Sequence, residues 1–265
     1  SSTMNRRAPI VATVLLVVVC MAVAQESKAQ SVDLVWLQIN RTDAHPRLLA
    51  LTQLAEELEK RTSLKVVASR SRVSIDSDAI FSNPLLFLSL EGPIELNKER
   101  TERLSRWLRA GGMLIIDYRG DPALSEQVRE SVALLAGELN LGSELTMLGR
   151  DNILLRTFYR LQRPTGRVEI FGALHGAFVD NRLALVMSFN DLMGAFDKKV
   201  DGSWRFRTIP GGDRQRERAM RLGVNLVVYS LCLDYKDEKI HLDYLKKMRN
   251  WHPSSSDPAT ERRVY

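Results

Sequence analysis

The first half of the chain alternates short apolar runs with amphipathic segments. The apolar runs are rich in β-branched residues and carry few charges, which is typical of buried strands. The strands expected from them are residues 32–39, 65–75, 85–90 and 113–118. The last run, MLIIDY, is apolar at nearly every position, which indicates a strand of a parallel sheet that helices cover on both faces.

The segments between these strands have apolar residues three or four positions apart, as the buried face of a helix requires. They predict helices over residues 46–60, 97–110 and 121–135. The second helix has the clearest boundaries. The side-chain oxygen of Asn97 can accept a hydrogen bond from a free backbone N–H at its start. Gly111 allows the left-handed backbone conformation that commonly ends a helix.

The second half of the chain is less regular. Strands are expected at residues 167–171 and 183–188, and Asp180-Asn181 marks a turn before the later one. The polar, glycine-containing stretch 198–216 favours a flexible loop. Residues 217–231 are apolar nearly all round and predict a buried helix. Asn225 interrupts that helix, and because a buried amide needs partners, we expect it to tie the helix to a neighbouring loop.

The alternation of strands and helices predicts an α/β fold, a three-layer sandwich around a mainly parallel sheet. We find no internal repeat and no long linker, so residues 25–252 are interpreted as a single domain. That domain would end in a short helix near residues 241–248. Residues 253–265 (PSSSDPATERRVY) have the composition of a disordered tail.

Residues 1–24 have the features of a secretory signal peptide. Arg6-Arg7 precede an uncharged apolar run at residues 10–21, and Ala22-Val23-Ala24 fits a cleavage site. The run is shorter than the ~20 residues that span a bilayer, although an uncleaved anchor is the alternative reading. We therefore expect a periplasmic or secreted protein with no stable membrane span after signal cleavage. Val19 before Cys20 does not fit a lipidation site.

The net charge of the chain adds little to this interpretation. Its formal net charge of +6 is modest for 265 residues, and no cluster of Lys and Arg alternates with aromatic residues. The sequence therefore gives no sign of nucleic-acid binding. If the signal is cleaved, Cys232 is the only cysteine left. No internal disulfide can then form, so the core must hold the fold.

Familiar catalytic motifs are absent from the sequence. There is no G-x-S-x-G or G-x-C-x-G nucleophile elbow, no phosphate-binding P-loop and no G-x-G-x-x-G. The four histidines do not occur at metal-ligand spacing. We therefore expect neither a cofactor nor a metal, and an enzymatic activity is uncertain, with a non-enzymatic role favoured.

Candidate binding residues follow from the fold, because ligands of open α/β sheets bind outside the carboxyl ends of the strands. Glu91 and Gly92 follow one strand, and other polar residues follow or flank two more. A carboxylate such as Asp117, at the end of an apolar strand, needs solvent or a partner. The candidate site consists of Asp117, Arg119, Asp121, Arg182, Asn190 and Asp191.

Each of these residues also has a purely structural explanation. Asp121 precedes Pro122 and fits a helix N-cap. Asp117 and Arg119 can form an ion pair with each other, which contributes little at a surface. Asn190-Asp191 can cap a helix that begins at Leu192.

Two interpretations apply to Arg182, which begins the strand at residues 183–188. It can pair with Asp180 or Asp191 as part of the fold. It can equally contribute to a ligand site.

Four segments in their order and spacing resemble domain-of-unknown-function family 4159. They are LFLSLEGPIELNKERTERLSRWLRAGGMLIIDYRGD, GRDNILLRTFYRL, DNRLALVMSFNDL and ERAMRLGVNLVVYSL, within residues 32–233. The resemblance implies a flavodoxin-like sandwich similar to class I glutamine amidotransferases. It does not carry over their chemistry, because the catalytic cysteine elbow and its histidine and glutamate partners have no counterpart here. The family has no established activity.

The same resemblance implies, by association, a role in the bacterial cell envelope. Related proteins carry this domain beside von Willebrand-type domains and MoxR-like ATPase systems, so an envelope protein is the expected partner. The membrane-spanning helices of those longer relatives are not found in this sequence.

Three functions follow from these observations. The first is a non-catalytic binding or interaction domain that holds a protein partner or a small polar ligand at the candidate site. The second is a hydrolase of a cell-wall or sugar substrate, with Asp117 and Asp191 as paired acid and base. The two carboxyl groups of such enzymes lie ~5–9.5 Å apart across a cleft. The third is a structural subunit that docks through residues 240–265.

Overall fold

The computed structural model describes residues 32–40, 47 and 49–233. Within this part of the chain, seven strands form one sheet in the order β2-β1-β3-β4-β7-β6-β5. The strands are β1 (Val32–Gln38), β2 (Val66–Ser74), β3 (Leu85–Leu90), β4 (Met113–Tyr118), β5 (Thr146–Met147), β6 (His175–Val179) and β7 (Arg182–Ser188). Strands β2, β1, β3, β4 and β7 run parallel, and β6 and β5 are added antiparallel at one edge.

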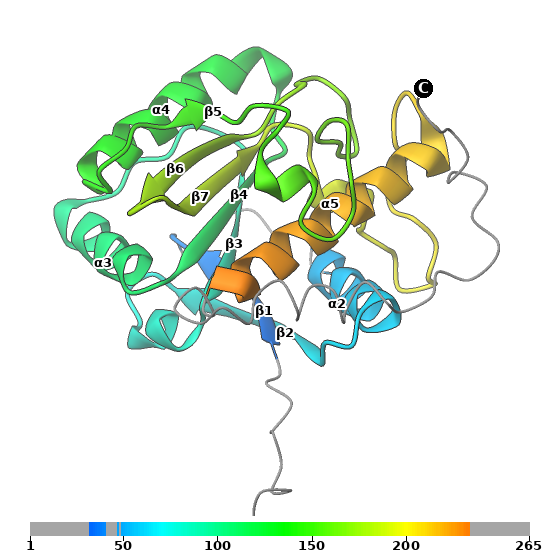
Figure 1. Cartoon of the computed structure of the whole chain (residues 1–265), viewed down its shortest axis with the longest axis horizontal. Coiled ribbons are helices and arrows are strands. Elements are labelled where there is room, and N and C mark those ends of the chain that lie inside the picture. Colours follow the sequence, from blue (N-terminus) through cyan, green and yellow to red (C-terminus); the bar gives the residue numbers. More distant parts are fainter. Residues whose placement is uncertain (1–31, 41–46, 48, 234–265) are drawn as a thin grey trace, which may run out of the picture. The chain divides into compact units, whose positions relative to one another are not determined.

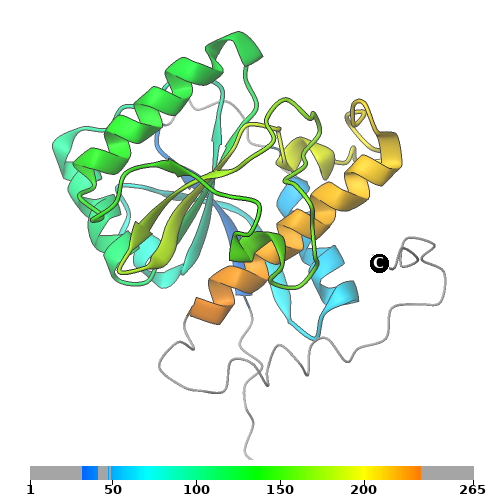
Figure 2. The ribbon, with the colours of Figure 1, turned by 45° about the horizontal axis from the view of Figure 1, so that its top comes forward.

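Helices pack on both faces of the sheet, so the expected α/β architecture with a mostly parallel sheet is confirmed (Figures 1 and 2). Helices α2 (Ala50–Arg61) and α5 (Gly212–Leu233) cover one face, and α3 (Lys98–Arg109) and α4 (Ser125–Glu138) cover the other. Short 3₁₀ turns complete the described elements. They are η1 (Asp78–Ser82), η2 (Pro122–Leu124), η3 (Ile153–Leu155) and η4 (Met193–Ala195).

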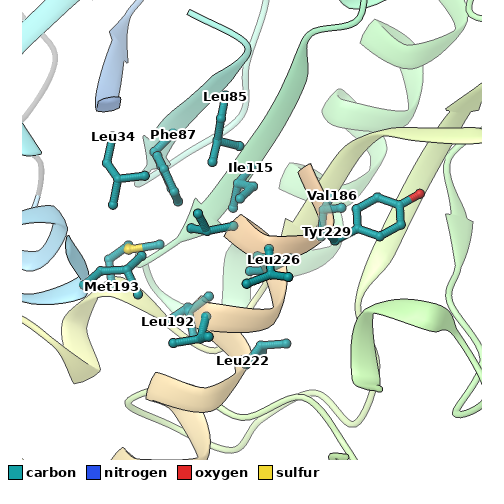
Figure 3. Close-up of a cluster of buried hydrophobic side chains, with 14 of the residues drawn as sticks. Leu34, Leu85, Phe87, Ile115, Val186, Leu192, Met193, Leu222, Leu226 and Tyr229 are labelled. Atoms are coloured by element: carbon teal, nitrogen blue, oxygen red, sulfur yellow. The ribbon is translucent and has the colours of Figure 1, made fainter. Parts of the chain in front are cut away.

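Two apolar cores result, one on each face of the sheet. On the face of α2 and α5, the buried cluster includes Leu34, Phe87 and Ile115 from the strands and Leu226 from α5, all shown in Figure 3. Alternate residues of the same strands, such as Leu86 and Ile116, belong to the cluster beneath α3 and α4. This division explains why β3 and β4 are apolar at nearly every position.

Two side chains cap the beginnings of helical segments, as the sequence predicted. The side chain of Asn97 accepts a hydrogen bond from the backbone N–H of Arg100 at 3.0 Å, at the beginning of α3. Gly111 follows α3 with a φ of 114°, a conformation that glycine adopts without strain. The side chain of Asp121 accepts from the N–H of Ala123 at 2.9 Å, so it caps η2, which leads into α4.

Several expected boundaries were wrong. Residues 167–171 form no strand, and only Val168 makes an isolated bridge, to Ile209. Strands β5 and β6 had not been predicted. Helix α5 begins at Gly212, so the expected loop at 198–216 is five residues shorter at its end. The expected signal segment at 1–24, the helix at 241–248 and the tail at 253–265 lie outside the described residues.

Candidate functional site

Asp117 lies at the carboxyl end of β4 and is buried, with 1% of its surface exposed. Its register neighbours on β3 and β7 are Ser89 and Ser188, so three polar side chains interrupt the apolar face beneath α2 and α5. The two carboxylate oxygens accept hydrogen bonds from the backbone N–H groups of Leu192 and Met193, at 2.7 and 2.8 Å. Asp117 thereby joins β4 to the turn that follows β7.

Burial and the nearby charge of Asp191 raise the pKa of Asp117 to about 8. The two backbone N–H donors and Arg47 act in the opposite direction, because they stabilise the charged form. Burial is the largest of these effects, so the pKa of Asp117 lies well above that of an exposed aspartate.

Asp191 carries the second buried carboxylate of this edge. Its oxygens accept hydrogen bonds from Arg47 Nη2 at 2.8 Å, from Arg167 Nε and from the backbone N–H of Gly194 at 3.1 Å. The backbone of Asp191 has a φ of 48°, an uncommon conformation for a residue with a side chain. It turns the chain so that Leu192 and Met193 enter the core (Figure 3), while their N–H groups face Asp117.

An aromatic ring covers the two arginines that hold Asp191. The ring centroid of Phe206 lies 4.0 Å from the guanidinium carbon of Arg47 and 5.7 Å from that of Arg167. Nearby, Arg205 forms an ion pair with Asp197 at 2.9 Å. The segment before α5 thus packs onto the Asp191 cluster and helps to bury it.

The side-chain amide of Asn190 forms hydrogen bonds with the backbone of residues 170 and 171. Its Oδ1 accepts from the N–H groups of Ile170 and Phe171, at 3.0 and 2.9 Å, and its Nδ2 donates to the carbonyl of Phe171 at 2.8 Å. The amide therefore fixes the segment that the sequence had suggested as a strand. The expectation that Asn190-Asp191 cap a helix beginning at Leu192 was wrong, because only the short turn η4 forms there, at Met193–Ala195. Within that turn, Asp191 alone accepts from the N–H of Gly194, at 3.1 Å.

Arg119 does not pair with Asp117, contrary to one expectation. Its Nε donates to the hydroxyl of Ser89 at 2.7 Å, and its Nη1 lies 2.7 Å from a carboxylate oxygen of Glu91. The Arg119 side chain is only 9% exposed, whereas that of Glu91 is 51% exposed. Arg119 thus links the ends of β4 and β3 and orients Glu91 at the surface.

A crevice of about 270 Å³ opens beside Glu91, outside the carboxyl ends of β1 and β3. Its walls combine buried aliphatic side chains with the exposed polar groups of Asn40, Glu91 and Glu95. The remaining lining residues are Ile39, Leu88, Ser89, Leu90, Gly92, Pro93 and Ile94. A small ligand with hydrogen-bond donors or a positive charge fits this lining.

The six candidate residues therefore separate into groups. Asp117, Asn190 and Asp191 lie at the carboxyl ends of β4 and β7, where their contacts are internal. Arg182 lies at the amino end of β7, far from Asp191 at the carboxyl end. Among the described residues it forms no ion pair with Asp180 or Asp191, so both expected partners were wrong. Its guanidinium donates to the carbonyls of Gly111 and Gly112, at 3.2 and 2.8 Å, and to that of Leu108.

No local sequence pattern indicates Arg47 and Arg167 as partners of Asp191. Arg47 is 144 residues from Asp191 in the chain, so only the folded sheet brings them together. Glu91 was recognisable as a polar residue after a strand, but its link to Arg119 was not.

Within the residues that the structure describes, no group of histidine, cysteine, aspartate or glutamate side chains could hold a metal ion. A search of the same residues finds no helix with the length and apolar character needed to cross a membrane.

The fold and the site define an α/β domain with a mostly parallel sheet and polar groups at the carboxyl ends of its strands. Residues 34–231 match the family described as a domain of unknown function (DUF4159). The chain belongs to this family, as the resemblance of its four segments indicated. No curated protein matches the chain.

Proposed function

We propose that this protein is an exported, non-catalytic binding domain of the bacterial cell envelope. Its scaffold would be flavodoxin-like and similar to class I glutamine amidotransferases. The order of the five parallel strands, β2-β1-β3-β4-β7, supports this assignment, because flavodoxin-like sheets have the order 2-1-3-4-5. Export rests on the signal features of residues 1–24, and the envelope partner rests on the resemblance to the family.

The observation that carries the binding role is the position of the crevice. The chain runs from β1 to β2 on one side and from β2 across to β3 on the other side of β1. The strand order therefore reverses between β1 and β3, and the crevice opens outside the carboxyl ends of these two strands. Open α/β sheets commonly bind ligands at such a reversal.

The internal contacts of the acidic residues favour binding over hydrolysis. A two-carboxylate hydrolase needs an acid and a base that face a substrate across a cleft. Asp117 and Asp191 are 1% and 2% exposed, and each of their oxygens accepts a hydrogen bond from the chain itself. The structural-subunit alternative depends on residues 240–265, which lie outside the described part of the chain.

The ligand or partner class follows from the lining of the crevice. Glu95 contributes negative charge, Glu91 contributes a carboxylate that Arg119 pairs from one side, and Asn40 contributes an amide. These groups favour a ligand with ammonium, amide or hydroxyl donors, such as an amino sugar, a peptide or a protein segment of that chemistry.

A side chain placed at Gly92 tests this proposal. A Cβ atom at Gly92 meets no atom within 4 Å, so Gly92→Gln would occupy the crevice without straining the fold. Gly149→Gln is the matched control, because Gly149 has the same free surroundings and does not line the crevice. The two variants would be compared in thermal-shift screens with amino acids, amino sugars and peptidoglycan fragments, and in pull-downs from envelope extracts.

We expect a ligand or partner that binds the natural protein and Gly149→Gln but not Gly92→Gln. A bound ligand present at 100 times its Kd stabilises a protein by about 2.7 kcal/mol, which a thermal shift detects. Binding that is equal in both variants would exclude the crevice as the site. Turnover of a peptidoglycan fragment would contradict the non-catalytic assignment.

A further inference from the structure

A second surface lies away from the crevice, in the segment that precedes α5. We call residues 198–211 the basic loop. In Figures 1 and 2 this yellow segment lies at the margin of the fold, beside the start of α5. Three large apolar side chains are exposed in it: Val200 (98% exposed), Ile209 (55%) and Trp204 (37%).

The first part of the basic loop is a tight hairpin. Lys198 and Trp204 form an antiparallel bridge, the N–H of Lys199 donates to the carbonyl of Ser203 at 2.8 Å, and that of Gly202 donates to Lys199 at 3.0 Å. Val200 therefore lies at the tip of the hairpin. Because Val200 is almost fully exposed, the fold buries almost none of its apolar surface. That surface can be buried against another molecule or in a membrane, which is energetically favourable.

The base of the hairpin is held by contacts with the rest of the domain. The guanidinium carbon of Arg216 lies 4.2 Å from the ring centroid of Trp204, and Lys198 Nζ lies 4.8 Å from it. Arg216 also donates to the carbonyl of Phe206 at 2.8 Å. Because the base is fixed in this way, the domain presents the tip in a defined position.

The segment that carries this tip has an excess of positive charge. Residues 198–221 contain eight Lys and Arg against three Asp and Glu, which accounts for most of the formal net charge of +6. Lys199, Arg207 and Arg214 are exposed. In the described part of the chain, the side chains of Arg207 and Arg214 form no ion pair. These charges are available to a negatively charged partner.

We propose that the basic loop docks onto the surface of an anionic phospholipid membrane. Val200 would enter the headgroup region, Trp204 would lie at the interface, and Lys199 and Arg207 would contact lipid phosphates. Tryptophan and exposed aliphatic residues among cations are characteristic of such contacts. Each Lys or Arg near an anionic surface contributes about 1 kcal/mol, or roughly a fivefold increase in partitioning.

The arrangement fits a membrane better than an acidic protein. A stable protein interface buries about 800 Å² on each partner around an apolar centre. Here the most exposed apolar residue, Val200, projects from a hairpin tip between Lys199 and Asp201, in a segment where cations outnumber acids. This inference does not depend on the ligand of the crevice.

Vesicle co-sedimentation of the full chain tests the proposal. Vesicles of phosphatidylcholine with one quarter phosphatidylglycerol would be compared with vesicles of phosphatidylcholine alone, at low and high salt. The test variants are Val200→Asp and the double variant Lys199→Glu/Arg207→Glu. The matched controls are Leu134→Asp and Lys98→Glu, at an exposed leucine of α4 and an exposed lysine of α3.

We expect binding that needs phosphatidylglycerol and weakens with salt. The double variant should lower partitioning by about 25-fold or more, at roughly fivefold for each charge. Val200→Asp should also lower it, and both controls should bind as the natural protein does. Residues 1–24 are the same in the natural protein, the test variants and the controls, so a difference between test and control variants reports on the basic loop alone.

Two results would overturn the proposal. One is equal partitioning of the natural protein and both test variants into the anionic vesicles. The other is binding of the natural protein to polyglutamate but not to vesicles, which would indicate an acidic protein as the partner. Circular dichroism of each variant would verify that it is folded.

Discussion

The turn after β7 depends on a close approach between Gly194 and Asp191. A Cβ atom at Gly194 would lie 2.3 Å from a carboxylate oxygen of Asp191, far closer than van der Waals contact allows. The carboxylate cannot withdraw easily, because Arg47, Arg167 and the N–H of Gly194 bind it. The absence of a side chain at this position is therefore a condition for the buried ion-pair cluster.

Gly194→Ala is expected to lower the free energy of unfolding by about 1–3 kcal/mol, as overpacking of a buried site does. Gly137→Ala is the matched control. Gly137 lies in α4, where a Cβ meets nothing within 4 Å, so this change should be neutral or stabilise the protein by up to about 1 kcal/mol. Urea denaturation of both variants measures the difference. Equal stability of the two would show that the turn adapts to a methyl group.

At the scale of elements, Asn225 attaches α5 to the segment that contains η3. Its Oδ1 accepts from the N–H groups of Phe158 and Tyr159, at 3.2 and 2.7 Å. Its Nδ2 donates to the carbonyls of Leu154 and Tyr159, at 2.6 and 2.9 Å. One buried amide thus satisfies four backbone groups of a segment that has little regular structure of its own.

Asn225→Ala should therefore lower the free energy of unfolding by at least about 2 kcal/mol, because it leaves buried backbone groups without partners. The control is Ser230→Ala, since the Ser230 hydroxyl donates within α5, to the carbonyl of Val227 at 2.7 Å. Hydrogen exchange adds a local readout: the amides of Phe158 and Tyr159 should exchange faster in Asn225→Ala only. Unchanged exchange at both amides would contradict the anchoring role.

Asn225 also shows what the sequence can and cannot predict. A polar amide inside an apolar helix requires partners, so its link to a loop was foreseeable, and the four parallel strands of the first half were foreseeable from their apolar runs. Strand β5 has only two residues, and β6 contains Gly176, so neither gives a strong strand pattern. Residues 167–171 have a strand-like composition, but Asn190 binds their backbone and holds them outside the sheet.

The candidate site was predictable only in part, for a related reason. The carboxyl ends of strands can be located once strands are assigned, and this placed Asp117 and Asp191 on the same edge. The partner of a charge comes from a distant part of the chain, as Arg47 and Arg167 do for Asp191. Which candidates face solvent and which are bound internally therefore depends on the complete fold.

For the whole molecule, the buried carboxyl of Asp117 affects how stability depends on pH. Its pKa is about 8 in the folded protein, against 3.8 for an ordinary aspartate. Between pH 3.8 and pH 8, the folded state therefore keeps a proton on Asp117 that the unfolded state has released. By linkage, the stability that this group contributes is fully present below pH 3.8 and is lost as the pH rises through 8.

Asp117→Asn removes this titration, because an amide is neutral at every pH. The melting temperature of the natural protein, relative to that of Asp117→Asn, should fall steadily from pH 5 to pH 8 and level off above pH 9. Thermal unfolding followed by circular dichroism, in buffers of constant ionic strength, measures this difference. The opposite result, an advantage that rises up to about pH 5 and is then constant to pH 9, would mean that the N–H groups of Leu192 and Met193 keep Asp117 ionised. Asp117 would then be an anion that holds the turn by charge, and the loss of either N–H contact would destabilise the sheet edge most at neutral pH.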